Sequence, residues 1–160
     1  MLRRRQFCLG EKGGACVGKT KRGKGTKIMA MADGAGLPLA ISIASASPHE
    51  VTLIEDLIEQ RFVDELPERI IGDAAYDSDP LDARLREQGV EMIAPNRSNR
   101  RHKTQDGRPM RRYRRRWMIE RLFAWLQGFR RITTRYEFHA VNFLGLVHLG
   151  CIIILLRNYL

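Results

Sequence analysis

Residues 113–127 read Tyr-Arg-Arg-Arg-Trp-Met-Ile-Glu-Arg-Leu-Phe-Ala-Trp-Leu-Gln, and their periodicity predicts one helix. At about 100° per residue, four polar side chains of this helix lie within about 60° of one another. They are Tyr113, Arg116, Glu120 and Gln127. A separate face has the spacing of a core-facing side and carries Ile119, Leu122, Phe123, Leu126 and Phe129. The polar face is therefore distinct from the core face and is available for function.

The rest of the chain alternates strands and helices. A hairpin of strands 26–32 and 37–44 is predicted around the turn Asp33-Gly34-Ala35-Gly36. The pattern then predicts, in order, a helix at 51–62, a strand at 69–71, a helix from Ser78 or Asp79 to Glu87, a strand at 90–93, and long helices at 113–127 and 140–157. A hairpin followed by strands with a crossover helix indicates a mixed α/β sheet with flanking helices. A length of 160 residues is that of one domain.

Charge is distributed unevenly along the chain, whose net charge is +10. Residues 1–27 contain nine Lys or Arg and one acid, and residues 97–116 contain ten and one acid. Residues 28–96 contain four Lys or Arg and fourteen acids. Basic clusters of this density suit a polyanion such as nucleic acid, with affinity that falls steeply with salt. The alternative interpretation of each basic stretch is a solvated loop or tail.

Cysteine usage and hydropathy bear on the compartment. The three cysteines lack metal-ligand spacing, and the four histidines are scattered, so neither a disulfide framework nor a zinc site is predicted. This pattern favours a reducing cytoplasm. The apolar run 141–156 is shorter than the roughly 20 residues of a membrane span and includes Asn142 and His148. It predicts a buried C-terminal helix, and no membrane partner is expected.

Asp73 is a second candidate for chemistry. It follows the apolar strand 69–71, and open α/β sheets place ligand sites at the carboxyl ends of their strands. Phosphodiester chemistry commonly uses two divalent ions about 4 Å apart, held by carboxylates. Asp73 and Glu120 suit those positions. The alternatives are a turn-capping role for Asp73 and a surface ion pair between Glu120 and Arg116, four residues earlier on the helix.

A competing motif lies in the N-terminal segment. Gly13, Gly18, Lys19 and Thr20 satisfy the written pattern of a nucleotide-binding P-loop. That site needs a buried strand before the glycines and a helix directly after them. The flanking residues are polar and rich in glycine and lysine, so a basic segment leading into the hairpin is the favoured interpretation.

The motifs together resemble those of DDE transposases of the insertion sequence 5 family. The spacing of Tyr113, Arg116, Glu120 and Gln127 is similar to that family's Tyr-Arg-Glu-Lys signature, and Asp73-Ala-Ala-Tyr-Asp-Ser resembles the motif around its second acid. The stretches 18–27, 33–39, 94–97 and 119–126 extend the resemblance over about residues 13–158.

The resemblance implies a ribonuclease-H-like mixed sheet that lacks its first strand, preceded by a basic segment at 1–25 and occupying 26–160. It implies DNA cleavage and strand transfer at insertion-sequence ends, with Asp73 and Glu120 as catalytic residues and ligands of Mg²⁺ or Mn²⁺. Residues expected to contact DNA are Lys103, Arg112, Tyr113, Arg115, Arg116 and Gln127. Expected partners are double-stranded DNA and a second copy of the chain or an upstream transposase segment, in the bacterial cytoplasm at the nucleoid.

The chain departs from the family pattern at several positions. Gln127 replaces the closing Lys, and Ala74-Ala75 replaces Lys-Gly. The family's first acid lies on the first strand, yet this chain has no Asp before Asp33, which is itself expected to be a turn residue. We therefore expect a downstream-frame or truncated product with an incomplete triad. The alternative is a DNA-binding remnant without catalysis that occupies element ends.

Overall fold

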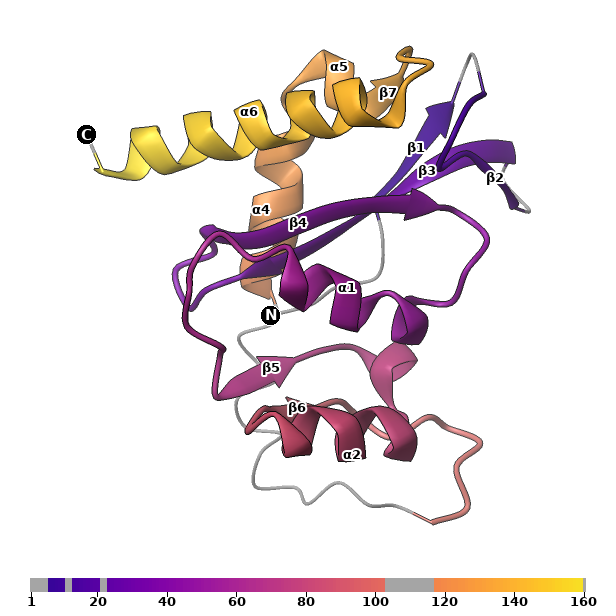
Figure 1. The fold of residues 1–160 in the computed structure, drawn as a ribbon, viewed down its shortest axis with the longest axis vertical. Helices are drawn as coiled ribbons and strands as arrows, with labels where there is room; N and C mark the ends of the chain where they lie inside the picture. Colours follow the sequence, from indigo (N-terminus) through magenta and orange to yellow (C-terminus); the bar gives the residue numbers. More distant parts are fainter. Residues whose placement is uncertain (1–5, 11–12, 21–22, 103–116, 160) are drawn as a thin grey trace.

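The computed structural model describes residues 6–10, 13–20, 23–102 and 117–159 (Figure 1). The strands are β1 (Gln6–Gly10), β2 (Gly18–Thr20), β3 (Gly23–Ala32), β4 (Pro38–Ser45), β5 (Arg69–Ile71), β6 (Glu91–Ile93) and β7 (Thr134–Arg135). The helices are α1 (Ile54–Glu59), α2 (Asp79–Glu87), α4 (Trp117–Gln127), α5 (Arg130–Thr133) and α6 (Ala140–Tyr159), with short 3₁₀ turns η1 (Glu50–Thr52) and η2 (Ala74–Tyr76). The fold is therefore mixed α/β, as the sequence predicts.

The described strands form two sheets. In the larger sheet the order is β2-β3-β1-β7, and β4 also pairs with β3. Its strand pairs are antiparallel except β1 with β7, which is parallel. The smaller sheet consists of β5 and β6 in parallel, with Ile70 opposite Met92. Both the antiparallel hairpin and the parallel pair were predicted, but their separation into two sheets was not.

The β3–β4 hairpin is the centre of the molecule because both of its faces are covered. Every residue of β3 from Gly25 to Ala32 is buried, and alternate side chains point to opposite faces. On one face, Ile28, Ala30 and Ala32 belong to a core cluster shared with α4 and α6. On the other, Met29 and Met31 pack in a cluster with α1, α2 and the β5–β6 pair. In Figure 1, α6 lies above the hairpin, α4 passes behind β4, and α1, β5, β6 and α2 lie below the hairpin.

Strand β1 differs from the expectation of a fold without its first strand. It precedes the hairpin and pairs antiparallel with β3, with Gln6 opposite Ile28 and Leu9 opposite Gly25. The absence of a first strand is therefore not confirmed. The segment 1–25, expected to lie before the fold, contributes β1 and β2 to the larger sheet. Local composition hid β2 because glycine and lysine are poor strand formers.

Two helices also differ from their predicted forms. The predicted helix 51–62 is divided into η1 and α1, and the chain after it returns to β4 through a bridge between Arg61 and Ala40. Helix α6 was expected to be buried, but only one of its faces is. The opposite face exposes Val141, Leu149, Ile152, Leu156 and Tyr159. By length and composition alone, α6 also meets the criteria for a membrane-crossing helix.

Candidate functional site

Asp73 lies directly after the buried end of β5. Gly72 precedes it, and a Cβ atom at Gly72 would lie 2.6 Å from the Met92 side chain and 2.7 Å from the Tyr76 ring. The close packing of this strand end therefore requires glycine. Asp73 is only 6% exposed and caps η2, because its Oδ1 accepts a hydrogen bond of 2.8 Å from the backbone N–H of Ala75. The carboxylate is thus buried and held in one orientation.

Other ionisable groups surround Asp73. Burial raises the pKa of Tyr76 above its ordinary value, and the nearby carboxylates of Asp73 and Glu50 raise it further. The Tyr76 hydroxyl is buried, and none of the described residues accepts or donates a hydrogen bond to it. Glu50 forms an ion pair of 3.3 Å with Lys27, whose side chain is 1% exposed. A buried polar cluster therefore lies beside the candidate acid.

A second set of contacts fixes η2 from the other side. Arg97 donates from its guanidinium to the carbonyl oxygens of Ala74 and Ala75, at 3.1 and 2.9 Å. Its backbone N–H donates to Asp77 at 2.7 Å. Asp77 also forms an ion pair with Arg100. These bonds attach the segment after β6 to the turn that carries Asp73.

Glu120 lies on the first described turn of α4 and is half-buried. The turn between β3 and β4 contacts this part of the helix, because Arg121 donates to the Ala35 carbonyl oxygen and Gly36 lies against the Met118 carbonyl. Gly36 has φ of 79°, a conformation that favours glycine. Along the long axis of the molecule, the amino end of α4 is the end closer to β5 and β6 (Figure 1). Gln127, the last residue of α4, is exposed.

The remaining predicted contacts lie outside the described residues. These are Lys103, Arg112, Tyr113, Arg115 and Arg116. The predicted polar face of helix 113–127 is therefore described only at Glu120 and Gln127.

The structure shows the roles of Asp33 and of residues 18–20, for which the sequence suggested a turn and a P-loop. Asp33 closes the hairpin turn, since its Oδ1 accepts hydrogen bonds from the N–H groups of Ala35 and Leu37, both at 2.8 Å. The turn role predicted for Asp33 is confirmed. Gly18, Lys19 and Thr20 form strand β2, which pairs with β3, where a P-loop would need a helix. The P-loop interpretation is therefore wrong.

Strands β2 and β3 also bring two cations together. Lys19 and Lys24 are opposite each other in the antiparallel register, and both are exposed. Like charges directly opposite in a sheet are destabilising, and a bound anion relieves the repulsion.

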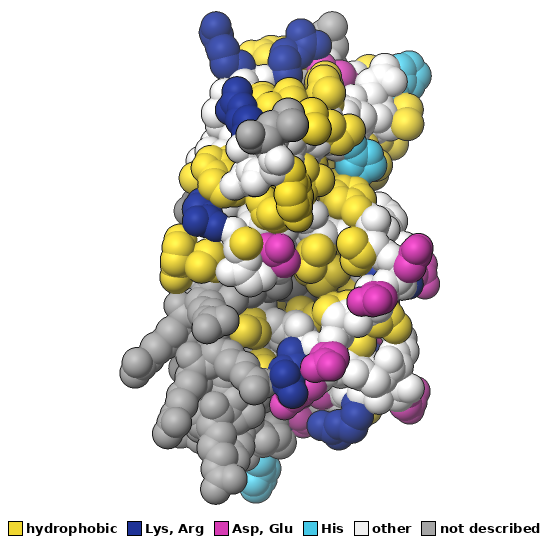
Figure 2. Space-filling model, turned by 90° about the vertical axis from the view of Figure 1, so that its left-hand side faces the viewer, with side chains coloured by type: hydrophobic (Ala, Val, Ile, Leu, Met, Phe, Trp, Pro, Cys, Tyr) yellow, Lys and Arg dark blue, Asp and Glu magenta, His cyan; other side chains and the backbone are white. Residues whose placement is uncertain are grey.

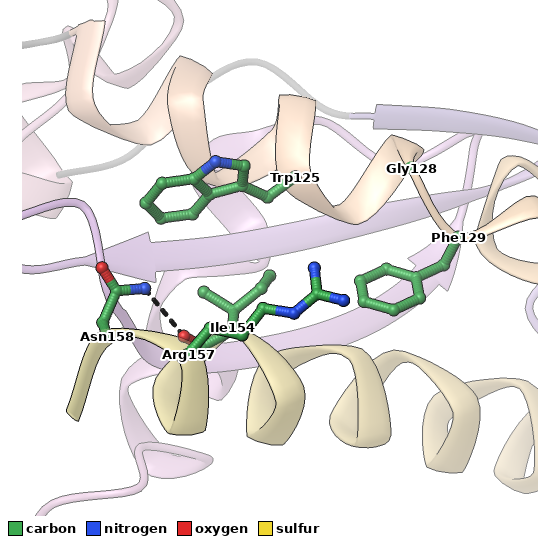
Figure 3. Close-up of a pocket in the computed structure, with 6 residues that line it drawn as sticks. All are labelled: Trp125, Gly128, Phe129, Ile154, Arg157 and Asn158. Atoms are coloured by element: carbon green, nitrogen blue, oxygen red, sulfur yellow. Dashed lines mark hydrogen bonds between the residues drawn. The ribbon is translucent and has the colours of Figure 1, made fainter. Parts of the chain in front are cut away.

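The surface of the molecule is divided between apolar and charged regions. In Figure 2, hydrophobic side chains gather over the upper half of the face shown, and acidic side chains lie mostly over its lower half. A pocket of about 310 Å³ between α4 and α6 is lined by Trp125, Gly128, Phe129, Ile154, Arg157 and Asn158 (Figure 3). No carboxylate lines it, so this pocket is distinct from the candidate site. The described residues contain no cluster of three or more His, Cys, Asp or Glu side chains that could hold a metal ion.

Sequence reasoning did not identify Lys27 and Glu50 as parts of this region, and it included Asp77 and Arg97 only as members of motifs, without a role. One signal was present at Lys27, because a lysine among the buried residues of a strand needs a partner. Nothing local marks Glu50 as that partner, since 22 residues separate the two in the chain. Arg97 and Asp77 meet only when the segment after β6 folds back onto η2.

Comparisons with known proteins agree on one family. The family described as "Transposase DDE domain" matches residues 4–156. A protein named "Putative transposase for insertion sequence element IS402", from Burkholderia cepacia, is 30% identical over 138 residues, which are 81% of this chain and 62% of that protein. A protein named "Putative transposase for insertion sequence element IS6501", from Brucella ovis, is 35% identical over 140 residues, covering 82% of this chain and 98% of that protein. No solved structure matches the chain. The chain thus spans 62% of the length of the IS402 relative.

Proposed function

Because this chain belongs to the family of DDE transposases, we propose that it acts in DNA cleavage and strand transfer at the ends of an insertion sequence. The observation that carries the proposal is the setting of Asp73, a buried carboxylate held at the carboxyl end of β5. Ligand sites of open α/β sheets lie at this end of the strands. Glu120, at the start of the described part of α4, is the second carboxylate of the proposed site.

The donor chemistry of these two residues fits a hard divalent ion. Mg²⁺ and Mn²⁺ prefer carboxylate and water oxygens, and Mg²⁺ is commonly held by one or two carboxylates with substrate phosphates. Asp73 and Glu120 would hold the ions in that way. When bound, two such ions activate the attacking oxygen and stabilise the leaving oxygen.

The chain's own residues prepare the site. The Ala75 N–H holds Asp73 in place, and Arg97 holds the carbonyl side of the same turn. Tyr76 is buried close enough to Asp73 that the charge of this carboxylate raises the pKa of the tyrosine. A carboxylate fixed before DNA binds needs little reorganisation during the reaction.

DNA would be held through its phosphates. The exposed pair Lys19 and Lys24 supports this proposal, because a phosphate between them relieves their repulsion. We extend it to Lys103, Arg112, Arg115 and Arg116, with Tyr113 and Gln127 as polar contacts. Phosphate contacts position DNA without reading its sequence. Affinity should fall about 10³-fold or more between roughly 50 and 200 mM salt if six or more phosphates are contacted.

We assign the chain to the insertion sequence 5 group on the motifs around Asp73 and Glu120, with transposition in the bacterial cytoplasm. The first acid of the triad would come from a residue other than Asp33, because Asp33 is engaged in the hairpin turn. An upstream transposase segment or a second copy would supply it. The second candidate function is a DNA-binding remnant that occupies element ends, favoured by the engagement of Asp33 in the hairpin turn.

The experiment uses the 160-residue chain with DNA that carries insertion-sequence ends, in Mg²⁺ or Mn²⁺. Asp73→Asn and Glu120→Gln are expected to abolish cleavage and to leave DNA binding within about twofold, because each removes a metal ligand and keeps the side-chain shape. Asp56→Asn and Glu59→Gln are matched controls on the exposed side of α1.

Cleavage that survives both site substitutions would overturn the catalytic assignment. Binding without cleavage in the unsubstituted chain, also after addition of an upstream transposase segment, would favour the remnant. Absence of salt-sensitive DNA binding would contradict both functions.

A further inference from the structure

Helix α6 is apolar on two opposite faces, and only one of them is covered. The covered face carries Phe143, Val147, Gly150, Cys151 and Ile154, which pack against β4, α4 and α5. The other face exposes large apolar side chains, and the exposed fractions are 72% for Val141, 52% for Leu149, 51% for Ile152, 51% for Leu156 and 77% for Tyr159. The solvent side of a surface helix is normally polar. A contiguous apolar face of this kind marks an interaction site.

The exposed residues form a continuous stripe of the kind that another helix covers. We define the α6 stripe as Asn142, Gly145, Leu149, Ile152, Leu156 and Tyr159. Its spacing alternates between three and four residues, as in the seam of a two-helix coiled coil. The covered face of α6 has the same alternation at Phe143, Val147, Gly150 and Ile154, and there the neighbours include two helices, α4 and α5.

The two glycines that lie in the middle of α6 differ in a way that points to a missing neighbour. A Cβ atom at Gly150 would lie 2.8 Å from Ile132 Cδ1, so packing inside the chain explains this glycine. A Cβ atom at Gly145 would meet nothing within 4 Å. Glycine inside a helix is unfavourable relative to alanine, and no contact within the described chain explains Gly145. A helix of another molecule that approached α6 closely at this position would explain the glycine.

The charges and the burial of α6 indicate which kind of molecule covers the α6 stripe. The chain carries a net charge of +10, but Arg157 is the only charged residue of α6 and lies outside the stripe. Two copies can therefore meet at this face without opposing cations. A helix that lies on a membrane has a polar face rich in Lys or Arg opposite its apolar face, whereas the opposite face of α6 is buried in the core.

We propose that two copies of this chain pair through the α6 stripe, helix against helix about a two-fold axis. Each copy presents the same surface, as a two-fold interface requires. Gly145 lets the two backbones approach, and Leu149 and Ile152 form the centre of the contact. The stripe is separate from Asp73 and Glu120, so the pairing does not depend on the proposed function. A single pair of helices is a small interface, and we expect a dissociation constant that is roughly micromolar.

The test is sedimentation equilibrium of the full chain, without DNA or metal. The unsubstituted chain should change from monomer to dimer with increasing concentration. Ile152→Glu is present in both copies, so it should raise the dissociation constant about a hundredfold or more. Leu66→Glu is the matched control, because Leu66 is also exposed, at 41%, and lies in the loop before β5. Circular dichroism should show that both variants retain their helix content.

Two further variants address geometry. Leu149→Cys in a Cys16→Ser background should form a disulfide-linked dimer on oxidation, because a residue near the middle of the stripe meets its own copy in either helix orientation. Gly145→Ala should raise the thermal stability of the monomer, since the site is open, and should weaken the dimer about tenfold by separating the backbones.

A chain that stays monomeric at all accessible concentrations would overturn the proposal. Equal weakening by Leu66→Glu would overturn it as well, since the contact would then not be the stripe. Monomers that bind phosphatidylcholine and phosphatidylglycerol vesicles through Ile152 would assign the face to a membrane.

Discussion

The two faces of the β3–β4 hairpin differ in the groups that pair with the buried cation on each face. On the α4–α6 face the core is apolar, and its buried cation, Arg135, donates to three uncharged acceptors. These are the Thr26 hydroxyl at 2.7 Å and the backbone oxygens of Glu137 and Phe138 at 2.9 and 3.0 Å. On the α1–α2 face, the buried ammonium of Lys27 is paired with the carboxylate of Glu50.

The difference follows from the chemistry of the two cations. A guanidinium spreads its charge over five N–H donors and is only weakly hydrated, so several neutral oxygens can satisfy it. An ammonium is a compact charge that needs a carboxylate when it is buried. Among the described residues, the buried acids Glu50, Asp73 and Asp77 lie on the α1–α2 side of the hairpin. One face contributes mainly stability, and the other provides a polar site.

The largest effect is expected from breaking the buried ion pair. Glu50→Ala leaves the Lys27 ammonium buried without a carboxylate and should lower the free energy of unfolding by about 3–5 kcal/mol. Urea denaturation measures this loss. The double variant Lys27→Met, Glu50→Leu should recover most of it, since no charge then remains buried. A loss below about 1 kcal/mol for Glu50→Ala would mean that water reaches Lys27 and that the two faces do not differ.

A cavity in the apolar face should have the next largest effect. Leu122 is fully buried between α4 and the hairpin, and Leu122→Ala should lower the free energy of unfolding by about 3 kcal/mol. Leu57→Ala, at an equally buried position on α1, should cost about 2 kcal/mol, because this six-residue helix can move into the space. Urea denaturation of the two variants under the same conditions measures both losses of unfolding free energy. A larger loss at Leu57 would reverse the assignment of stability to the α4–α6 face.

Removing one neutral acceptor of Arg135 should have a smaller effect. Thr26→Val keeps the shape of the side chain but leaves a buried N–H of Arg135 without its acceptor, and should cost about 1–3 kcal/mol. Thr26→Ser keeps the hydroxyl and should cost less. Thermal unfolding of both variants tests this order. If valine proves as stable as threonine, the guanidinium does not need this acceptor.

The smallest effect concerns pH on the acidic side of the molecule. Burial, and then the charges of Asp79 and Asp77, raise the pKa of Asp82 from 3.8 to about 6. The folded state therefore favours the protonated form, and this group's contribution to stability declines as the pH rises from about 4 to about 6. Because Asp82 is partly exposed, the decline should be modest.

Asp82→Asn should flatten the pH dependence of unfolding between pH 4 and 6. Asp56→Asn, at an exposed position on α1, serves as the control. An unchanged slope in Asp82→Asn would show that the carboxylate is well hydrated.

Local sequence was sufficient to predict the elements that carry the candidate site. The hairpin turn at Asp33, strand 69–71, the helix ending at Glu87 and the helix that carries Glu120 all appear where periodicity and turn residues indicate them. Each of these signals lies within about 10–15 residues. Strands β1 and β7 were missed because their pairing joins Leu9 to Thr134, far apart in the chain and without a local pattern.

Family membership, the order of the elements and the positions of Asp73 and Glu120 on a strand end and a helix are readable from the sequence, because motifs and periodicity are local properties. The tertiary structure decides which polar groups are buried and what satisfies them, as at Lys27 with Glu50 and Arg135 with Thr26. It also decides that only one face of the apolar helix α6 is covered. Burial depends on contacts between residues distant in the chain, and such contacts exist only once the chain has folded.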